Sequence, residues 1–136
     1  NQPVIVTGGA TGIGQQIVRA FVHQGSKVGF IDLDWRGSKK LQEELNNQVT
    51  FEICDLTIIE NLKKAFLSLR KKIGKPSVLA NNAARDDRHN WQDVTSNYFD
   101  ERIATNLKHI FFAIQSVAPD MIKHGGGSII NLGSNS

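Results

Sequence analysis

The stretch that decides the fold runs from Val4 to Phe21 and reads VIVTGGATGIGQQIVRAF. It opens on three consecutive apolar residues, a pattern typical of a strand that is buried on both faces. Ile13, Ile17 and Phe21 then recur at helical spacing and predict the apolar face of an amphipathic helix. Glycines separate the two segments, and glycine permits positive φ angles and the close approach of a ligand. The stretch therefore predicts a strand, a glycine turn and a helix.

A turn of this kind can bind a phosphate or pyrophosphate, because free backbone N–H groups and the positive end of the helix dipole meet there. The spacing is Thr-Gly-x-x-x-Gly-x-Gly and not the G-x-G-x-x-G of many dinucleotide folds. This pattern resembles the cofactor loop of the short-chain dehydrogenase/reductase family. The resemblance implies that a dinucleotide lies against Gly8, Thr11, Gly12, Ile13 and Gly14. The alternative is a tight turn whose glycines serve packing alone.

The composition is that of an ordinary globular domain. Of the 136 residues, 40% are hydrophobic and 21% are charged, and the formal net charge is +3, so one domain with a modest core is expected. Basic residues are scattered or lie in short runs, which argues against a nucleic-acid partner. No apolar run approaches the ~20 residues that span a bilayer, so we expect no membrane partner.

The single cysteine, Cys54, excludes an internal disulfide and favours a reducing, cytoplasmic location. Its neighbours Phe51 and Ile53 are apolar, so we interpret Cys54 as a buried strand residue and not as a nucleophile. The first residues predict a strand and not a signal peptide.

Residues 27–32 predict a second strand, which ends at Asp32, 18 positions after Gly14. In a βαβ nucleotide unit, an acidic residue about 20 positions on hydrogen-bonds the ribose hydroxyls. The next residue is Leu33 and Thr11 is not basic, so nothing favours a 2′-phosphate and we expect NAD over NADP. Asp32 could instead cap nearby amides, and Asp34 is a competing ribose ligand.

Two candidate site positions follow the next predicted elements, a surface helix over 38–46 and a strand over 49–54. Thr57 and Glu60 have the spacing of a capping box, for a helix that ends before Gly74. Asp55 and Leu56 lie in the loop before it, at the carboxyl end of a strand, where ligands of open α/β sheets bind. By the resemblance Asp55 hydrogen-bonds the adenine amino group; it could equally be an extra helix-start acid.

A short strand over 78–80 leads into Asn81-Asn82-Ala83-Ala84, which is similar to the family's Asn-Asn-Ala-Gly element beside the cofactor. Asn82 and Ala83 match its cofactor side. Asn81 could serve a purely structural role, because an asparagine can tie loops to neighbouring strands.

The segment from Arg85 to Trp91 is dense in polar groups. Its acids and His89 could suggest a metal site, but neighbouring arginines neutralise them and no second ligand cluster stands out, so we expect no metal. Ala-Ala-x-Asp-Asp-Arg-His resembles the short-chain aldose dehydrogenases, which oxidise free sugars such as xylose or galactose. The substrate that this resemblance implies is a small alcohol or sugar.

A long helix is predicted from about Ser96 to His124. Asn106 falls on its apolar face, where an unpaired polar side chain would cost about 1–3 kcal/mol. Asn106 is therefore held either by main chain or by ordered water. Its setting resembles the family's catalytic asparagine, which holds a water in the proton relay. The predicted apolar stripe consists of Phe99, Ile103, Ile110, Ile114, Val117 and Met121.

Residues 128–132 predict a fifth strand, and Ser134 follows it. On its own Ser134 is a turn serine. It matches the family's catalytic serine, whose hydroxyl steadies the substrate oxygen.

Strands that alternate with helices predict an α/β fold, a doubly wound parallel sheet of Rossmann type. We expect the order 3-2-1-4-5 with right-handed crossovers, and further strands beyond the given chain. Residues 1–136 would then be a dinucleotide-binding domain truncated before its C-terminal part. The family's Tyr-x-x-x-Lys acid/base is expected beyond Ser136, since Tyr98 is followed at that spacing by Arg102.

These features predict an NAD-dependent short-chain oxidoreductase that transfers a hydride between the nicotinamide and an alcohol or carbonyl substrate. A non-catalytic dinucleotide-binding module is the alternative. The helix before the fifth strand carries excess apolar residues, so we expect a homo-oligomer, a dimer or tetramer. Because the fifth strand would be an apolar edge, residues 1–136 alone are expected to aggregate and to turn over little or nothing.

Overall fold

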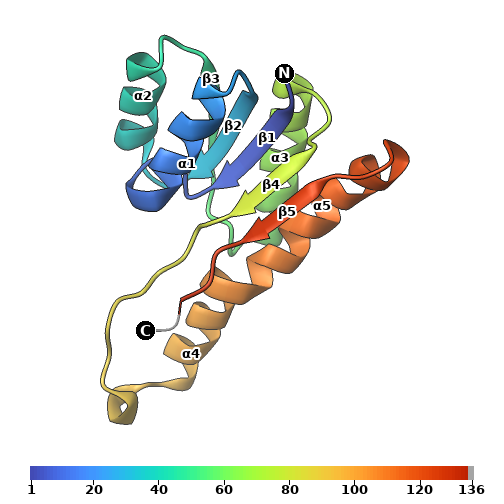
Figure 1. The fold of residues 1–136 in the computed structure, drawn as a ribbon. Coiled ribbons are helices and arrows are strands. Elements are labelled where there is room, and N and C mark those ends of the chain that lie inside the picture. Colours follow the sequence, from blue (N-terminus) through green and yellow to red (C-terminus); the bar gives the residue numbers. More distant parts are fainter. Residues whose placement is uncertain (135–136) are drawn as a thin grey trace.

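Five parallel strands form one sheet in the order β3-β2-β1-β4-β5 (Figure 1). The computed structural model describes residues 1–134. The strands are β1 (Pro3–Thr7), β2 (Lys27–Asp32), β3 (Val49–Ile53), β4 (Val78–Asn81) and β5 (Ser128–Asn131). The predicted α/β architecture and strand order are both confirmed.

The central strand β1 is buried on both faces, as its unbroken apolar run predicts. Val4, Ile5 and Val6 have no exposed surface. Val6 is in register with Phe30 of β2 on one side and with Ala80 of β4 on the other. Burial on both sides is possible because helices cover both faces of the sheet.

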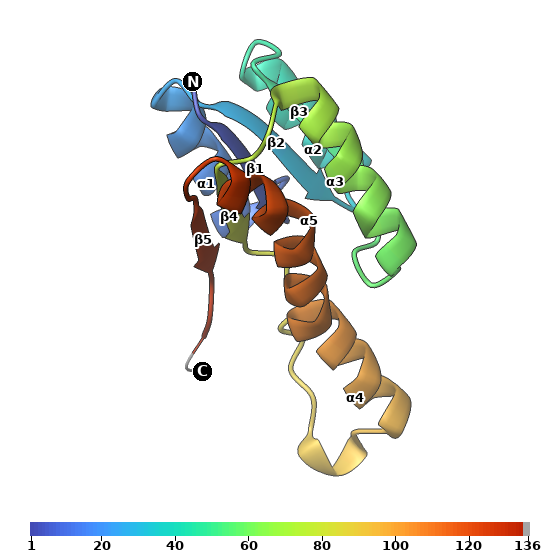
Figure 2. The same cartoon turned by 90° about the vertical axis from the view of Figure 1, so that its right-hand side faces the viewer.

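Two pairs of helices form the outer layers (Figures 1 and 2). Helices α1 (Gly12–His23) and α2 (Trp35–Glu44) cover the face that carries Val6 and Phe30. Helices α3 (Ile59–Ile73) and α5 (His109–Lys123) cover the opposite face, which carries Ile5 and Leu79. Alternate residues of each strand therefore feed two separate cores.

The predicted apolar face of α1 is wrong at its first position, because Ile13 is 67% exposed. The buried residues of this helix are Gly14 and Val18. Gly14 faces inward because the first turn packs directly on the backbone of the glycine loop, where a side chain as large as that of Ile13 has no space.

Helix α2 begins at Trp35, three residues before the predicted start. Asp34 is its N-cap, and the Asp34 carboxylate accepts a hydrogen bond from the Gly37 N–H at 2.9 Å. An N-terminal cap of this kind satisfies a backbone donor that has no partner within the helix.

The predicted end of α3 is confirmed, with Gly74 as the C-cap, where φ is +100°. The predicted capping box is wrong: Ile58 is the N-cap and provides no side-chain hydrogen bond. The Thr57 hydroxyl donates instead to Asp55 Oδ1 at 2.6 Å. The charged carboxylate two residues away is the stronger acceptor, so it takes the hydroxyl that a capping box would use.

The long helix consists of α4 (Ser96–Ile103), a π-helical turn η2 (Ala104–Lys108) and α5, with a short 3-10 turn η1 (Trp91–Asp93) before them. The predicted stripe is wrong over its first half, because Phe99 and Ile103 are 59% and 41% exposed. The wider π turn rotates α4 relative to α5, and α4 also extends past the edge of the sheet (Figure 2). The buried residues of α5 are His109, Ala113, Val117 and Met121.

Cys54 is 7% exposed, and its burial raises the pKa of the thiol to about 11. The interpretation as a buried residue is therefore confirmed, since a protonated thiol is a poor nucleophile. Among the helices of residues 1–134, none is long and apolar enough to cross a membrane.

Candidate functional site

The glycine loop turns sharply at the carboxyl end of β1. Gly8 and Gly12 have positive φ angles of +70° and +55°, and the Gly8 N–H donates to Ile31 O at 2.7 Å. A Cβ on Gly14 would overlap Gly8 O and the side-chain amide of Asn82. The loop therefore needs glycine for two reasons: conformation at Gly8 and Gly12, and close approach at Gly14.

The N-terminus of α1 fits a bound diphosphate. Thr11 is the N-cap, but its side chain makes no capping hydrogen bond, and the first turn contains no acidic residue. The space beside Gly12 is open, since a Cβ there would meet nothing within 4 Å. Backbone N–H groups at such a helix terminus attract anions, so Thr11, Gly12 and Ile13 could contact a pyrophosphate.

The Asp32 carboxylate joins the glycine loop to the segment after β2. Its Oδ2 accepts a hydrogen bond from the Ala10 N–H at 2.9 Å, and its Oδ1 accepts one from the Asp34 N–H at 3.0 Å. Asp32 therefore does cap nearby amides, yet each carboxylate oxygen retains a second acceptor position. Asp34, the competing residue, is already engaged as the cap of α2.

Asp55 lies in the loop that follows β3, the strand next to β2, and the loop starts beside Asp32, whose carbonyl oxygen accepts from the Cys54 N–H at 3.1 Å. Asp55 Oδ1 accepts hydrogen bonds from the Thr57 N–H and hydroxyl. Leu56 is 9% exposed. Asp55 thus holds the turn that precedes α3 without capping the helix itself, and its second carboxylate oxygen remains available.

Thr7 fastens the loop after β4 to the glycine loop. Its hydroxyl oxygen, which is buried, accepts from the N–H groups of Asn82 and Ala83, each at 3.1 Å. The Asn82 side chain donates to Gly8 O at 3.0 Å. The structure therefore brings Gly8, Gly14, Asn82 and Ala83 together. The role of Thr7 was missed, and its only signal in the sequence was its place before Gly8.

Asn106 lies in the π turn and is exposed, so the prediction that it sits on a buried apolar face is wrong. Both ends of its amide pair with the main chain of Arg85: the Arg85 N–H donates to Asn106 Oδ1 at 2.8 Å, and Asn106 Nδ2 donates to Arg85 O at 2.9 Å. Main chain and ordered water were the two expected partners of Asn106, and in the structure its amide pairs with main chain. Asn106 thereby fixes the loop after β4 to the helix.

An ion-pair network extends this attachment. Asp87 pairs with Arg85 at 2.7 Å and with Arg102 at 3.0 Å, and Arg85 also pairs with Glu101 at 2.5 Å. Hydrogen bonds from Arg85 and Arg102 lower the pKa of the Asp87 carboxyl. Within residues 1–134, no group of three or more His, Cys, Asp or Glu side chains could hold a metal ion.

The polar loop after β4, which begins at Arg85, also lines a hollow. Its lining residues are Arg88, His89, Asn90 and Asp93. His89 is held by stacking on Tyr98, with 4.4 Å between ring centroids. These side chains offer both donors and acceptors to a polar ligand.

Ser134 follows β5 at the same edge of the sheet. The Leu132 N–H donates to Asn81 O at 3.1 Å, and the Asn81 side chain donates to Asn131 Oδ1 at 2.8 Å. Asn81 therefore has the structural role that the sequence left open, because it joins the ends of β4 and β5. Ser134 lies just after this joined end of β5.

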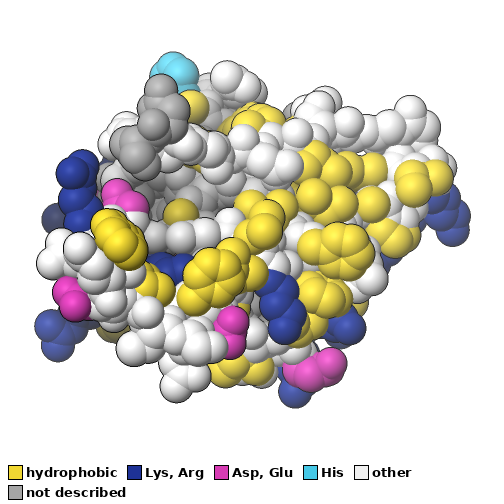
Figure 3. All heavy atoms as spheres, turned by 90° about the horizontal axis from the view of Figure 1, so that it is seen from below, with side chains coloured by type: hydrophobic (Ala, Val, Ile, Leu, Met, Phe, Trp, Pro, Cys, Tyr) yellow, Lys and Arg dark blue, Asp and Glu magenta, His cyan; other side chains and the backbone are white. Residues whose placement is uncertain are grey.

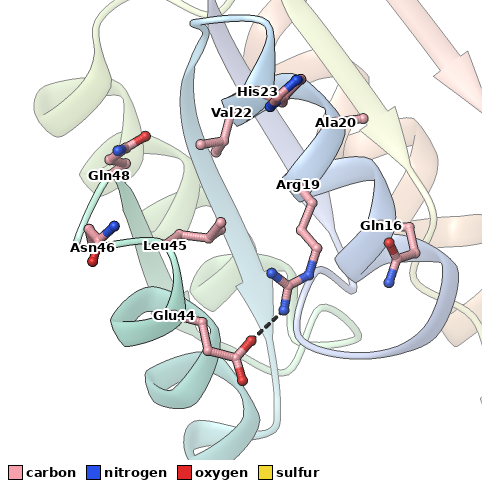
Figure 4. A pocket seen from close by; sticks show the side chains of 9 residues that line it. All are labelled: Gln16, Arg19, Ala20, Val22, His23, Glu44, Leu45, Asn46 and Gln48. Carbon is pink, nitrogen blue, oxygen red and sulfur yellow. Dashed lines mark hydrogen bonds and ion pairs between the residues drawn. The ribbon is translucent and has the colours of Figure 1, made fainter.

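A second hollow lies between α1 and the end of α2 (Figure 4). An ion pair between Arg19 and Glu44 crosses it, and none of the predicted site residues lines it. The polar edge around the glycine loop is therefore the candidate site.

Comparisons with known proteins agree with this geometry. The family model described as short chain dehydrogenase matches residues 2–136. D-xylose 1-dehydrogenase of Caulobacter vibrioides is 44% identical over 134 residues, which are 96% of this chain and 52% of that protein. The probable galactose dehydrogenase GalD of Rhizobium meliloti is 43% identical over 135 residues, or 96% and 53% of the two chains.

The fold is shared with solved structures. The crystal structure of gox2181 superposes with a TM-score of 0.92 at 29% identity, over 98% of this chain and 54% of that one. The chain thus spans about half the length of the relatives that it matches. The resemblance read from Thr-Gly-x-x-x-Gly-x-Gly and Asn-Asn-Ala is confirmed, and the chain belongs to the short-chain dehydrogenase family.

Proposed function

We propose that this chain is the cofactor-binding part of an NAD-dependent oxidoreductase that oxidises a free sugar at its anomeric carbon to a lactone. The observation that carries the oxidoreductase proposal is the α1 terminus, with uncapped amides and open space at Gly12, beside the carboxylate of Asp32. Support for a sugar comes from the relatives named for xylose and galactose oxidation. The polar loop around His89 adds hydrogen-bonding groups suited to sugar hydroxyls.

Different residues at this edge of the sheet would contact different parts of the dinucleotide. We propose that the amides of Gly12 and Ile13 hold the diphosphate and that Asp32 accepts from the adenosine ribose hydroxyls. Asp55 and Leu56 would border the adenine. Asn82 and Ala83 would border the second ribose, held in place by the Thr7 hydroxyl.

The remaining site residues of the chain would contact the substrate or position the groups around it. When bound, the dinucleotide supplies the acceptor or donor of the hydride. The Ser134 hydroxyl would donate a hydrogen bond to the substrate oxygen and stabilise charge that develops on it. Asn106 would fix the π turn against Arg85 and so keep the proton-relay side of the site in place.

The proposal is tested by assaying the intact protein with NAD⁺ and NADP⁺ against xylose, galactose, a steroid alcohol, an acyl thioester and a simple aliphatic alcohol. We expect reduction of NAD⁺ with a free sugar and formation of the lactone. Activity confined to the steroid, thioester or aliphatic substrates would reject the sugar, and no activity on any alcohol would reject the oxidoreductase.

Replacement of Asp32 tests the cofactor preference. Asp32→Ala removes the acceptor for the ribose hydroxyls and the negative charge that repels a 2′-phosphate, so affinity for NAD⁺ should fall about tenfold, equivalent to ~1.4 kcal/mol, and discrimination against NADP⁺ should shrink. The measurement is titration of the intact protein with both dinucleotides.

Asp34→Asn is the matched control, because it removes a nearby charge while asparagine still caps α2. The Asp34→Asn variant should prefer NAD⁺ over NADP⁺ to the same degree as the unaltered protein. Equal affinity of the unaltered protein for the two dinucleotides, or an unchanged preference in Asp32→Ala, would contradict the assignment.

We also propose that the intact protein is a homo-oligomer that uses the helix α4–α5. Large apolar side chains are exposed along this helix, and Figure 3 shows hydrophobic side chains gathered on the face seen from below Figure 1. A contiguous apolar surface of this kind is typical of an interface. The exposed residues are Phe99 (59%), Ile103 (41%), Leu107 (60%) and Phe111 (64%). A monomeric mass of the intact protein in sedimentation would contradict the proposal.

A further inference from the structure

Two buried polar atoms at the interface of sheet and helix lack hydrogen-bond partners among the described residues. They are Nε2 of His109, whose residue is fully buried, and Oδ1 of Asn81, whose residue is 2% exposed. An unpaired buried polar group costs about 1–3 kcal/mol. Such atoms are rare in folded proteins, and buried water is one of their usual partners.

The two side chains occupy the same layer between β4 and α5. Leu79 of β4 and Ala113 of α5 belong to one buried cluster. Asn81 is two residues after Leu79 and so lies on the same face, about 6.7 Å further along the strand. His109 is four residues before Ala113, about 6 Å along the helix.

The directions of β4 and α5 place Asn81 and His109 at the same edge of the sheet. The chain leaves β4, returns through α5 and enters β5, which is parallel to β4. A Cβ on Gly127, just before β5, would overlap Met121, so the end of α5 lies at the amino edge of the sheet. The start of α5, with His109, therefore lies at the carboxyl edge with Asn81 (Figure 2).

Both unpaired atoms are hydrogen-bond acceptors. His109 Nδ1 is 2.5 Å from Thr105 O, and because a carbonyl oxygen only accepts, Nδ1 carries the proton. Burial lowers the pKa of His109 and so favours the neutral ring, in which Nε2 has a lone pair when Nδ1 carries the proton. Asn81 Nδ2 donates to Asn131, so its other end, Oδ1, also accepts. Two acceptors cannot pair directly, but one water molecule can donate a proton to each.

We propose that a single buried water bridges His109 Nε2 and Asn81 Oδ1, and that His109 is thereby a positioning residue for the π turn that carries Asn106. The resulting chain runs from Asn131 through Asn81, the water and His109 to Thr105, the neighbour of Asn106. This chain of hydrogen bonds would join the ends of β4 and β5 to the helix from within. The pairing of Asn106 with Arg85 joins the loop after β4 to the same helix at the surface.

The bridge is tested first without any assay of activity. In the intact protein, nitrogen-15 NMR should find the proton of the neutral His109 ring on Nδ1, and a high-resolution crystal structure should contain a water within hydrogen-bonding distance of both atoms. A proton on Nε2, or a direct contact of His109 with a reversed Asn81 amide, would overturn the proposal. The NMR and crystallographic measurements do not depend on the proposed oxidoreductase activity. A failure of the bridge proposal can therefore be distinguished from a failure of the proposed function.

The positioning role, which rests on the proposed function, is tested by substitution. His109→Asn can still donate to Thr105 O but is too short to accept from the water, so kcat should fall at least fivefold while KM for the dinucleotide stays within twofold. Val117→Ala is the control, because it weakens packing on the same buried stripe without touching the chain of hydrogen bonds. It should lower the unfolding temperature and leave kcat unchanged. An unchanged kcat in His109→Asn, or an equal loss in Val117→Ala, would overturn the positioning role.

Coupling between the two residues provides an independent measurement. The effects of His109→Asn and Asn81→Ala on the unfolding equilibrium constant should be non-additive by at least threefold, because either change alone breaks the same bridge. Additive effects would overturn the proposal. If either variant fails to fold, the NMR and crystallographic results on the unaltered protein decide.

Discussion

Gly14→Ala is expected to destabilise the intact protein by about 3 kcal/mol or more, at the upper end of what overpacking costs. The added methyl group would overlap Gly8 O and Asn82 Nδ2, and neither atom can move freely. Gly8 is held by its hydrogen bond to Ile31 O, and Asn82 is held by Thr7. The first turn of α1 must therefore separate from the loop, so dinucleotide affinity should be lost together with stability. Denaturant unfolding and dinucleotide titration measure the two effects.

Two substitutions in the same helix separate the clash from other effects. Gly12→Ala meets no atom within 4 Å, so only its positive φ should cost stability, about 1–2 kcal/mol. Gln16→Ala, on the exposed side of α1, should be close to neutral. If Gly14→Ala proved no more destabilising than Gly12→Ala, the close packing of α1 on the glycine loop would be refuted.

With the proposed function, Asn106→Ala is expected to lower kcat of the intact protein by about tenfold to a hundredfold, with a smaller change in KM for the proposed sugar substrate. The substitution removes both hydrogen bonds to Arg85, so the loop after β4 and the π turn are no longer fixed to each other. A displacement of about 1 Å at a reacting site can cost a hundredfold in rate. Steady-state kinetics below the unfolding temperature measure this loss.

Lys108→Ala is the matched control for Asn106. Lys108 lies in the same π turn and is exposed. Its replacement tests whether any change in this turn slows the reaction. We expect kcat within twofold of the unaltered enzyme. A normal kcat in Asn106→Ala would remove Asn106 from the site.

The sequence by itself determined the architecture of this protein. Local patterns carry that information: the apolar run from Val4 to Val6 requires cover on both faces, and alternation of strands with helices then requires parallel strands. The glycine spacing likewise indicated where a strand passes through a turn into a helix. Gly74 marked the end of α3, because a left-handed residue there stops the helix.

Only the tertiary structure decided which side chains meet across distant segments. Thr7 binds the amides of Asn82 and Ala83, some 75 positions away, and Asn106 binds the main chain of Arg85. Periodicity cannot report such pairs, because it describes a helix or strand in isolation. It also failed over α4, where a stripe drawn with 3.6 residues per turn cannot anticipate a π turn. That turn exposes Phe99 and Ile103, and the buried face of α5 begins at His109, a residue that no local pattern distinguished, because its burial comes from the fold.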